Sequence, residues 1–442
     1  MKRYEAYKPS GTAWFTSVPE PWNILKINAL FSQRKEKVSD KDFAPISVTK
    51  NGIMPQLETV AKTDDGDNRK KGCVGDFVIN SRSDRKGSCG ISSFDGSVSL
   101  INIVLQPRQE LNGRYAHYLL RSQPFSEEFY RNGRGIVADL WTTRYSEMKN
   151  ILLPVPPRDE QNQIVRYLDW QVSKINRLIA AKRKQVELMK DNLKSAVAKL
   201  TTHGIGSHDM CRSEIYWLTE YPSTWHVTKL KYILKKHRRK VPPNAELLIC
   251  SNSGEVTKRG DGKLGLVAAS DDIYQGVKTG DLLIHGMDTW HGAIAISNFD
   301  GMCTPVVHVC TCREEKRFVA YYLKMMAYTK VFKAISNGVR QNTSDFRSWD
   351  KVGDLLICLP DISEQVAIAD ELDKLTDATK KGIACFERHI EKLVDLRTRL
   401  ISDVVTGQID VRGIEVPDYE HYDEAPENAT EESSDSDYDT EE

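Results

Sequence analysis

Two loops that carry basic and amide side chains occupy matching places in this sequence. Residues 80–87 read Asn-Ser-Arg-Ser-Asp-Arg-Lys-Gly, and residues 285–291 read His-Gly-Met-Asp-Thr-Trp-His. Arginine and lysine can bind guanine or phosphate, and asparagine and glutamine can bind adenine in the major groove. The pattern favours contact with nucleic acid, and ordinary solvated turns are the alternative.

A second pair of polar loops precedes the two longest helical segments. Residues 132–134 are Asn-Gly-Arg, and residues 337–342 are Asn-Gly-Val-Arg-Gln-Asn. Within each loop pair the position is shared and the side chains differ, as two modules that read different sequences would require. The basic run at 235–240 favours phosphate contact, which gives affinity without sequence preference. The candidate DNA-binding residues are Asn80, Arg82, Arg85, Lys86, Arg134, His285, Thr289, His291, Arg340, Gln341 and Asn342.

The distribution of charge favours a polyanionic partner. The 442 residues carry 62 Lys and Arg against 62 Asp and Glu, but residues 413–442 hold 13 acidic residues and no Lys or Arg. Residues 1–412 therefore have a net charge of +13. A surplus of basic side chains attracts phosphate groups.

The composition argues against several classes of protein. No run approaches the roughly 18 apolar residues of a membrane-spanning helix, and the start, Met-Lys-Arg-Tyr, lacks the apolar stretch of a secretory signal. Nine scattered cysteines fit reduced thiols better than a disulfide framework. We therefore expect a cytoplasmic protein of two or three domains.

The sequence predicts neither a catalytic site nor a metal site. It lacks the Gly-x4-Gly-Lys-Ser/Thr phosphate loop, the His-Glu-x-x-His motif, the Gly-x-Ser-x-Gly elbow and the Asn/Asp-Pro-Pro-aromatic loop of amino-methyltransferases. One cluster has metal-binding residue types, but its spacing is not that of zinc knuckles. After a shift of 205, His308 and Cys310 fall on Ile103 and Leu105, which predicts core positions. The cluster comprises His285, His291, Cys303, His308, Cys310 and Cys312.

The chain repeats itself at about half its length. The pattern Trp-apolar-Thr-x-x-Pro-x-x-Trp occurs at 14–22 and at 217–225, and Glu-Gln-x-x-Ile-x-x-x-Leu-Asp occurs at 160–169 and at 364–373. A repeat of fixed length indicates how the chain divides into similar structural units, so it is considered before individual helices and strands. This period indicates a duplicated two-part unit. Shorter matches at an offset of 205 are Gly75-Asp76 with Gly280-Asp281, Asp95-Gly96 with Asp300-Gly301, and Asn132-Gly133 with Asn337-Gly338.

Each half begins with mixed helix and strand character and ends in one long helix, at 160–203 and at 364–406. Short segments rich in Val, Ile and Leu and bounded by Gly, Asp or Ser predict strands, and helical periodicity predicts shorter helices. The expected strands are 72–80, 98–106, 280–284 and 305–312, and the expected shorter helices are 115–130 and 318–335.

Both long segments have a heptad pattern. Apolar residues follow alternating steps of four and three in the first segment, where Lys182 is the exception, and a weaker seam recurs after a shift of 204. Each helix would be about 66 Å long at 1.5 Å per residue. Asp159 and Ser363 are the expected N-caps, and Gly204 and Gly407 the expected ends. The seam residues include Leu168, Val172, Ile175, Ile179, Val186, Leu193, Leu200, Leu372, Ile383, Ile390, Leu393, Leu400 and Val404.

A long helix between globular modules could be a flexible linker, a homodimerising coiled coil or an internal spacer. Two matching seams in one chain favour pairing with each other, antiparallel because the chain must return through the second module. The expected fold class is therefore α+β, with two similar α/β modules alternating with two long helices in a pseudo-twofold antiparallel coiled coil. Pairing between two chains remains the alternative.

These features resemble the DNA-specificity subunit of type I restriction-modification enzymes. The resemblance rests on Tyr-Glu-Ala-Tyr-Lys-Pro-Ser-Gly-x-x-Trp at 4–14, on Pro-x-x-Trp at 19–22, and on the twice-used Leu-Pro, Glu-Gln-x-x-Ile and long-helix block. It covers about residues 1–412. It implies two target-recognition domains, each reading one half of a bipartite asymmetric site in double-stranded DNA. The family subunit has no catalytic residue, so none is carried over.

The resemblance also implies partners and domain limits. Two methyltransferase subunits would supply S-adenosylmethionine binding and adenine-N6 methylation, and restriction subunits would supply the ATP- and Mg2+-dependent steps that defend against foreign DNA. This chain would bind no cofactor itself. The domains would be recognition domain 1 at 1–155, spacer helix 1 at 156–206, recognition domain 2 at 207–360, spacer helix 2 at 361–412 and a tail at 413–442. The partner-docking residues would be Leu168, Ile175, Ile179, Val186, Leu372, Ile383, Ile390 and Leu393.

Two features stand outside the family pattern. The second Leu-Pro loop lacks the Pro-Pro found at 156–157, and the acidic segment 413–442 has no counterpart. We expect this segment to be disordered, and it either adds solubility or competes with DNA for the basic body. The hypothesis from another functional class is a coiled-coil scaffold that assembles partner proteins without reading DNA.

Overall fold

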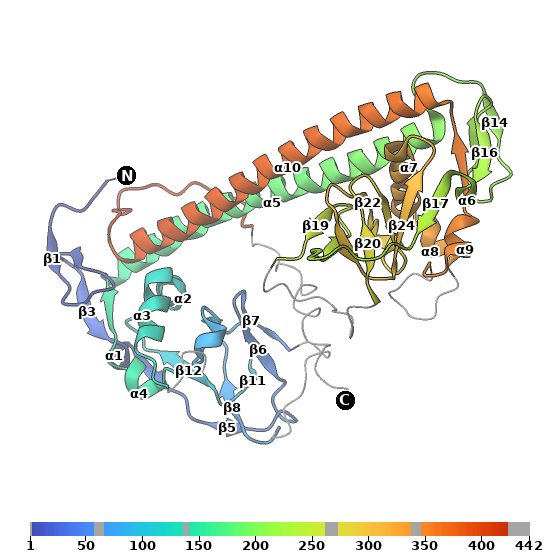
Figure 1. The fold of residues 1–442 in the computed structure, drawn as a ribbon. Helices are drawn as coiled ribbons and strands as arrows, with labels where there is room; N and C mark the ends of the chain where they lie inside the picture. Colours follow the sequence, from blue (N-terminus) through green and yellow to red (C-terminus); the bar gives the residue numbers. More distant parts are fainter. Residues whose placement is uncertain (1, 57–65, 136–140, 261–272, 337–345, 423–442) are drawn as a thin grey trace. The chain divides into compact units, whose positions relative to one another are not determined.

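The computed structural model describes residues 2–56, 66–135, 141–260, 273–336 and 346–422 (Figure 1). It divides into two compact units. The first unit comprises residues 1–183 and 387–442, and the second comprises residues 184–386. Both long helices therefore run from one unit into the other, and the rest of each sequence half lies within one unit.

The first unit is built on a four-stranded antiparallel sheet with the order β10-β9-β12-β4 and a three-stranded sheet with the order β11-β8-β5. Two-stranded pairs β1-β2, β6-β7 and β13-β3 complete it. The strands are β1 Tyr7–Pro9, β2 Ser17–Pro19, β3 Asn23–Lys26, β4 Phe31–Gln33, β5 Lys37–Val38, β6 Ile46–Thr49, β7 Gly52–Pro55, β8 Arg69–Gly72, β9 Phe77–Asn80, β10 Cys89–Ile91, β11 Gly96–Val98, β12 Asn102–Pro107 and β13 Leu152–Val155.

The second unit repeats this plan. Its four-stranded sheet has the order β17-β24-β21-β22, and the pairs are β14-β15, β16-β25, β18-β19 and β20-β23. Ile103 pairs with Ile79 in the first sheet and His308 pairs with Ile284 in the second, so the register matches at an offset of 205. The strands are β14 Met210–Arg212, β15 Glu220–Pro222, β16 His226–Lys229, β17 Leu234–His237, β18 Leu248–Cys250, β19 Val256–Lys258, β20 Gln275–Val277, β21 Leu282–His285, β22 Ile294–Ile296, β23 Gly301–Cys303, β24 Val307–Cys312 and β25 Leu356–Leu359.

Short helices cover each four-stranded sheet, and their apolar faces enter the core. In the first unit the buried aromatic residues Tyr115, Phe125 and Phe129 belong to one cluster with Phe77 and Leu105 of the sheet. Burial of such side chains is the main stabilising term. The short helices are α1 Ile27–Leu30, α2 Gly113–Arg121, α3 Gln123–Arg131, α4 Tyr145–Met148, α6 Leu230–Ile233, α7 Lys316–Tyr328, α8 Val331–Ile335 and α9 Trp349–Gly353, with 3-10 turns η1 Ser83–Arg85 and η4 Thr289–His291.

Several predicted elements are shorter than expected. The helix predicted at 115–130 is two helices that break at Ser122, because Pro124 has no backbone N–H to donate to the Leu120 carbonyl and its ring clashes with that carbonyl. The helix predicted at 318–335 breaks where Lys330 adopts a positive φ of 60°. The strand predicted at 72–80 is β8 and β9 separated by a turn at Gly75, whose φ is +88°.

The two long helices are present as predicted, at α5 Arg158–His203 and α10 Ile362–Val405. They end at Gly204 and Gly407, whose φ angles of +73° and +75° lie in the left-handed region. The predicted N-caps are wrong, since Asp159 and Ser363 lie inside the first turns. Asp361 caps α10, because its carboxylate accepts the backbone N–H of Glu364 at 2.9 Å.

The long helices pair with each other within one chain, as Figure 1 shows. In the first unit Arg397 of α10 donates to the Asn176 side chain of α5 at 2.6 Å. In the second unit the Met189 side chain of α5 lies against Gly382 of α10. Later residues of α5 meet earlier residues of α10, so the pair is antiparallel. The predicted fold class is confirmed.

This pairing buries part of the predicted docking surface. Leu168, Ile175, Ile179, Val186 and Leu372 are at most 7% exposed, because they face the helix pair and the adjoining core. The assignment of these five residues to partner docking is therefore wrong in this structure. The other three lie half-buried on the same seam, namely Ile383, Ile390 and Leu393.

The expected disorder from residue 413 onward is wrong for residues 413–422. Gln163 of α5 donates to the Ile414 carbonyl at 2.6 Å, and Arg177 binds the Glu420 carboxylate at 3.2 Å. The backbone N–H of Tyr422 donates to the Ser173 hydroxyl at 2.8 Å. These ten residues lie along α5 because their backbone groups find partners there. Residues 423–442 lie outside the described part of the chain.

Candidate nucleic-acid interface

In the first unit the structure brings the two predicted loops together. Arg82 and Arg134 each form an isolated β-bridge with Thr142. Arg134 and Thr142 exchange backbone hydrogen bonds of 3.2 and 3.1 Å, and Ser83 donates to the Trp141 carbonyl at 3.0 Å. Loops separated by some fifty residues in sequence therefore form one surface.

Four of the five predicted residues on this surface are exposed, namely Arg82, Arg85, Lys86 and Arg134. Asn80 is the exception at 7% exposed. Its side-chain oxygen accepts the Arg82 N–H at 3.0 Å, so it shapes the turn and is not accessible to DNA in this structure. Arg85 lies on η1, whose fold is set by the hydrogen bond from Arg85 N–H to the Arg82 carbonyl.

Trp141 is a residue of this surface that the sequence reasoning missed. It is 40% exposed and holds Ser83 through its backbone carbonyl. An exposed indole on a surface that also carries cationic side chains can pack against a sugar or a base. No periodic or motif signal marks Trp141, because its place depends on a contact between loops that are distant in sequence.

In the second unit the equivalent loop starts where β21 ends. The backbone N–H of Phe346 donates to the Gly286 carbonyl at 3.0 Å, as Thr143 donates to Ser81 at 2.9 Å in the first unit. His285 is half-buried, and burial lowers its pKa while the nearby Asp288 acts in the opposite direction. Its Nδ1 accepts the Asp288 N–H at 3.2 Å. His285 therefore offers a neutral ring rather than a positive charge.

The other predicted DNA-binding residues of this unit differ in their exposure. His291 is exposed at the end of η4. Thr289 is fully buried, so it is not accessible to DNA and the prediction that it contacts DNA is wrong in this structure. Arg340, Gln341 and Asn342 lie outside the described residues.

The strands that carry these loops are fixed by the repeated Gly-Asp step. The Asp76 carboxylate accepts from Arg34 at 2.6 Å and from the Cys73 N–H at 2.9 Å. Asp281 accepts from Arg239 at 3.1 Å and from the Lys278 N–H at 2.8 Å. Both aspartates are 2% exposed. A buried carboxylate with both a cation and an N–H donor holds the start of β9 or β21 in place.

The predicted core positions of His308 and Cys310 fit the structure. His308 and Cys310 are fully buried on β24, and burial raises the pKa of Cys310 to about 12. His308 Nε2 donates to the Phe346 carbonyl at 2.7 Å. Among the described residues no group of three or more His, Cys, Asp or Glu side chains could hold a metal ion.

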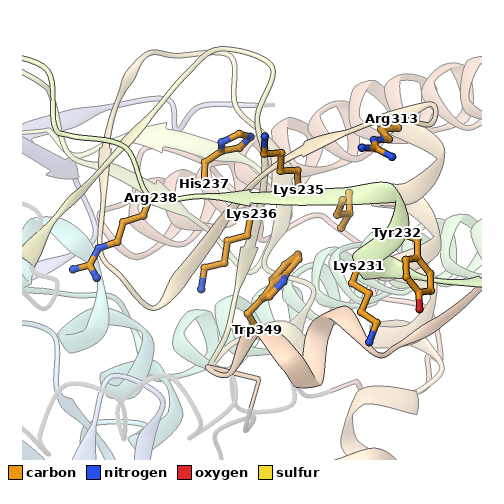
Figure 2. A pocket seen from close by; sticks show the side chains of 9 residues that line it. Lys231, Tyr232, Lys235, Lys236, His237, Arg238, Arg313 and Trp349 are labelled. Atoms are coloured by element: carbon orange, nitrogen blue, oxygen red, sulfur yellow. The ribbon is translucent and has the colours of Figure 1, made fainter.

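The second unit also has an open pocket of about 670 Å³, which we call the basic pocket (Figure 2). It lies over α6, β17 and the start of α9. The lining residues of the basic pocket are Lys231, Tyr232, Leu234, Lys235, Lys236, His237, Arg238, Arg313 and Trp349.

Within the described part of the chain, no helix has the apolar length needed to span a membrane.

Comparison with known proteins adds relatives of nearly the same length. No family model matches the chain. The type I restriction enzyme MjaVIII specificity subunit of Methanocaldococcus jannaschii is 24% identical over 429 residues, which cover 90% of this chain and 95% of that protein. The similarity includes both halves of the repeat.

One solved structure extends the comparison to the fold. A chain from a structure described as the "structural basis underlying complex assembly and conformational transition of the type I R-M system" has a TM-score of 0.63 at 12% identity, covering 89% of this chain and 99% of that one. The HsdS subunit from Thermoanaerobacter tengcongensis has a TM-score of 0.44 at 15% identity, covering 89% and 98%. The resemblance that the sequence indicated is confirmed: over nearly its whole length this chain is similar to the specificity subunits of type I restriction-modification enzymes.

Proposed function

We propose that this chain is the sequence-specific DNA-binding subunit of a cytoplasmic type I restriction-modification complex. Each unit reads one half of a bipartite asymmetric site, and the α5–α10 pair spaces the two readings. The observation that carries the proposal is the duplicated framework with unlike loops at matching strand ends. Similarity to named specificity subunits along the whole chain supports it.

In this proposal the exposed residues of the two loop surfaces contact DNA. They are Arg82, Arg85, Lys86 and Arg134 with Trp141 in the first unit, and His285 and His291 in the second. Arginine and lysine contacts give both base recognition and phosphate affinity. The long helices dock two methyltransferase subunits through faces other than their paired seam. S-adenosylmethionine, ATP and Mg2+ belong to the methyltransferase and restriction partners.

The test is co-expression of the full chain with its cognate methyltransferase, followed by genome-wide mapping of N6-methyladenine. A bipartite methylated motif that disappears when this chain is omitted supports the proposal. Methylation that is unchanged without the chain contradicts it. Replacing residues 1–155 by another such domain should change one half of the motif, and a change in both halves would contradict the division of labour between the units.

A further inference from the structure

The basic pocket of the second unit has a strong excess of positive charge. Five of its nine lining residues are Lys or Arg and none is Asp or Glu. Lys231 pairs with Asp354 at 2.9 Å, and Lys229 uses the same carboxylate at 3.0 Å. Within the described residues Lys235, Lys236, Arg238 and Arg313 have no ion pair. Uncompensated cations repel one another, and a bound anion relieves that repulsion.

The pocket also has aromatic walls. Tyr232 is 63% exposed, and the Lys236 ammonium lies 5.9 Å from the centre of the Trp349 ring. Figure 2 shows Lys235 and His237 on one side of β17 and Lys236 on the other, beside Trp349. Burial and the neighbouring Arg239 and Lys235 lower the pKa of His237, so its ring is neutral at neutral pH. Cationic tips over aromatic faces suit a phosphate group that is attached to a sugar.

Protection of a sheet edge does not account for these lysines. β17 is the edge strand of its sheet, and edge strands often carry lysine to prevent pairing with another chain. β4 is the matching edge strand of the first unit. There Ser32 and Gln33 pair with the residues equivalent to those opposite Lys235 and Lys236. The first unit has no charge at these two positions, so edge protection alone does not require the two lysines on β17.

The pocket adjoins the predicted recognition loop of its own unit. The Trp349 ring lies 5.6 Å from the His308 ring, measured between centres. His308 donates to the Phe346 carbonyl at 2.7 Å, and the Phe346 N–H donates to Gly286 at the start of the loop at 3.0 Å. An anion held in the pocket would therefore lie within a few side chains of the 285–291 loop.

We propose that the basic pocket is a phosphate-binding site through which the second unit holds the DNA backbone, and that the matching edge strand β4 in the described part of the first unit offers no equivalent site. This inference rests on the proposed function. It predicts that the pocket adds a sequence-independent, salt-sensitive contribution to the affinity of the second unit. A free polyphosphate shares the chemistry, but the position beside the recognition loop favours DNA.

The test measures binding of labelled target and non-target duplexes to the full chain in complex with its methyltransferase, across a salt titration. Loss of one phosphate contact lowers the slope of log K against log salt by about 0.9. The double variant Lys235→Ala/Lys236→Ala should therefore lose about 2 from the slope and bind both duplexes at least tenfold more weakly at about 0.1 M salt. Lys278→Ala is the control, because Lys278 is an exposed lysine of the same unit that does not line the pocket.

A second variant tests the same idea in the first unit by adding positive charge at the matching positions. Ser32→Lys/Gln33→Lys places two lysines at the matching positions of the first unit and should raise non-target affinity and the salt slope. If the double lysine-to-alanine variant keeps the wild-type slope while the wild-type complex binds its target, the pocket proposal fails and the proposed function stands. If the wild-type complex prefers no bipartite sequence, the proposed function itself fails.

Calorimetry with tripolyphosphate separates the two sources of phosphate. Under the DNA proposal, tripolyphosphate binds weakly and the double variant loses DNA affinity. Tight tripolyphosphate binding that the double variant abolishes, together with unchanged DNA affinity, would overturn the proposal in favour of a free ligand.

Discussion

The two units hold their parts together with the same contacts at matching positions. Trp22 donates its indole N–H to Glu160 at 2.9 Å, and Trp225 donates to Glu364 at 3.2 Å. Tyr118 donates to Asp169 at 2.7 Å, as Tyr321 donates to Asp373 at the same distance. These residues are the ones that recur in the sequence. Repetition in this chain therefore marks the framework of each unit.

The two units share these framework contacts, but they carry different exposed side chains at matching positions. At the end of β9 the first unit presents arginines and an exposed indole, and at the end of β21 the second unit presents histidines. The basic pocket of the second unit corresponds to a neutral edge in the first. A duplicated framework with unlike surfaces is what recognition of an asymmetric site requires, because identical surfaces would read a symmetric one.

The largest expected effect concerns the loop surface of the first unit. Arg82→Ala/Arg134→Ala should abolish methylation of the full motif or relax one half of it, because each specific arginine contact contributes about 1–3 kcal/mol. Mapping of N6-methyladenine with the variant checks this. Arg131→Ala is the control, since Arg131 is an exposed arginine of the nearby α3 that pairs with Glu128. Relaxation of both half-sites would show that the units do not read separately.

Asp76 and Asp281 should contribute similar amounts to the stability of their own units. Asp76→Ala and Asp281→Ala each remove a buried carboxylate from a partly exposed arginine and leave the backbone N–H of Cys73 or Lys278 without its acceptor, which costs about 1–3 kcal/mol. Hydrogen exchange should show the loss of protection in the substituted unit alone. A much smaller cost at one position would mean that its ion pair with Arg34 or Arg239 does not stabilise that unit in solution.

Acid should destabilise the first unit through one residue that the second unit lacks at the matching position. Burial, followed by Arg121 and Arg114, lowers the pKa of His117 to about 3, and the residue at the matching position of the second unit is Ala320. The unfolded chain takes up a proton below about pH 6.5 that the folded unit does not. The folded unit therefore loses about 1.4 kcal/mol per pH unit as the pH falls from about 6 to 4.

Chemical denaturation at several pH values, with hydrogen exchange to separate the units, measures this effect. His117→Ala should flatten the pH dependence of the first unit, because it removes the group that titrates. A variant with the same acid sensitivity as the wild type would assign the effect to another group.

The sequence predicted the parts that local patterns determine. The heptads fixed the long helices, and Gly204 and Gly407 ended them, because only glycine takes positive φ there without strain. The Gly-Asp repeat located the strands that carry the loops. The features that the sequence did not predict depend on contacts between distant segments. The Trp141 carbonyl accepts a hydrogen bond from Ser83 of the other loop, and Thr289 is buried. Trp349 lines the basic pocket although it lies more than a hundred residues after β17.

The smallest expected effect concerns the acidic segment at the end of the sequence. Because residues 413–422 bind α5, the charge of the remaining segment is best tested by deleting residues 423–442 alone, which removes ten acidic residues and leaves the Ser173 and Arg177 contacts in place. If the segment competes with DNA, the deletion should raise non-target affinity a few-fold at low salt and have no effect at high salt, because screening weakens long-range attraction. Combining it with Lys235→Ala/Lys236→Ala identifies the place of competition. A gain in affinity that vanishes in the combined variant would assign the competition to the basic pocket of the second unit. Equal affinity of the deleted and intact chains across the salt titration would contradict competition, and the segment would then act only on solubility.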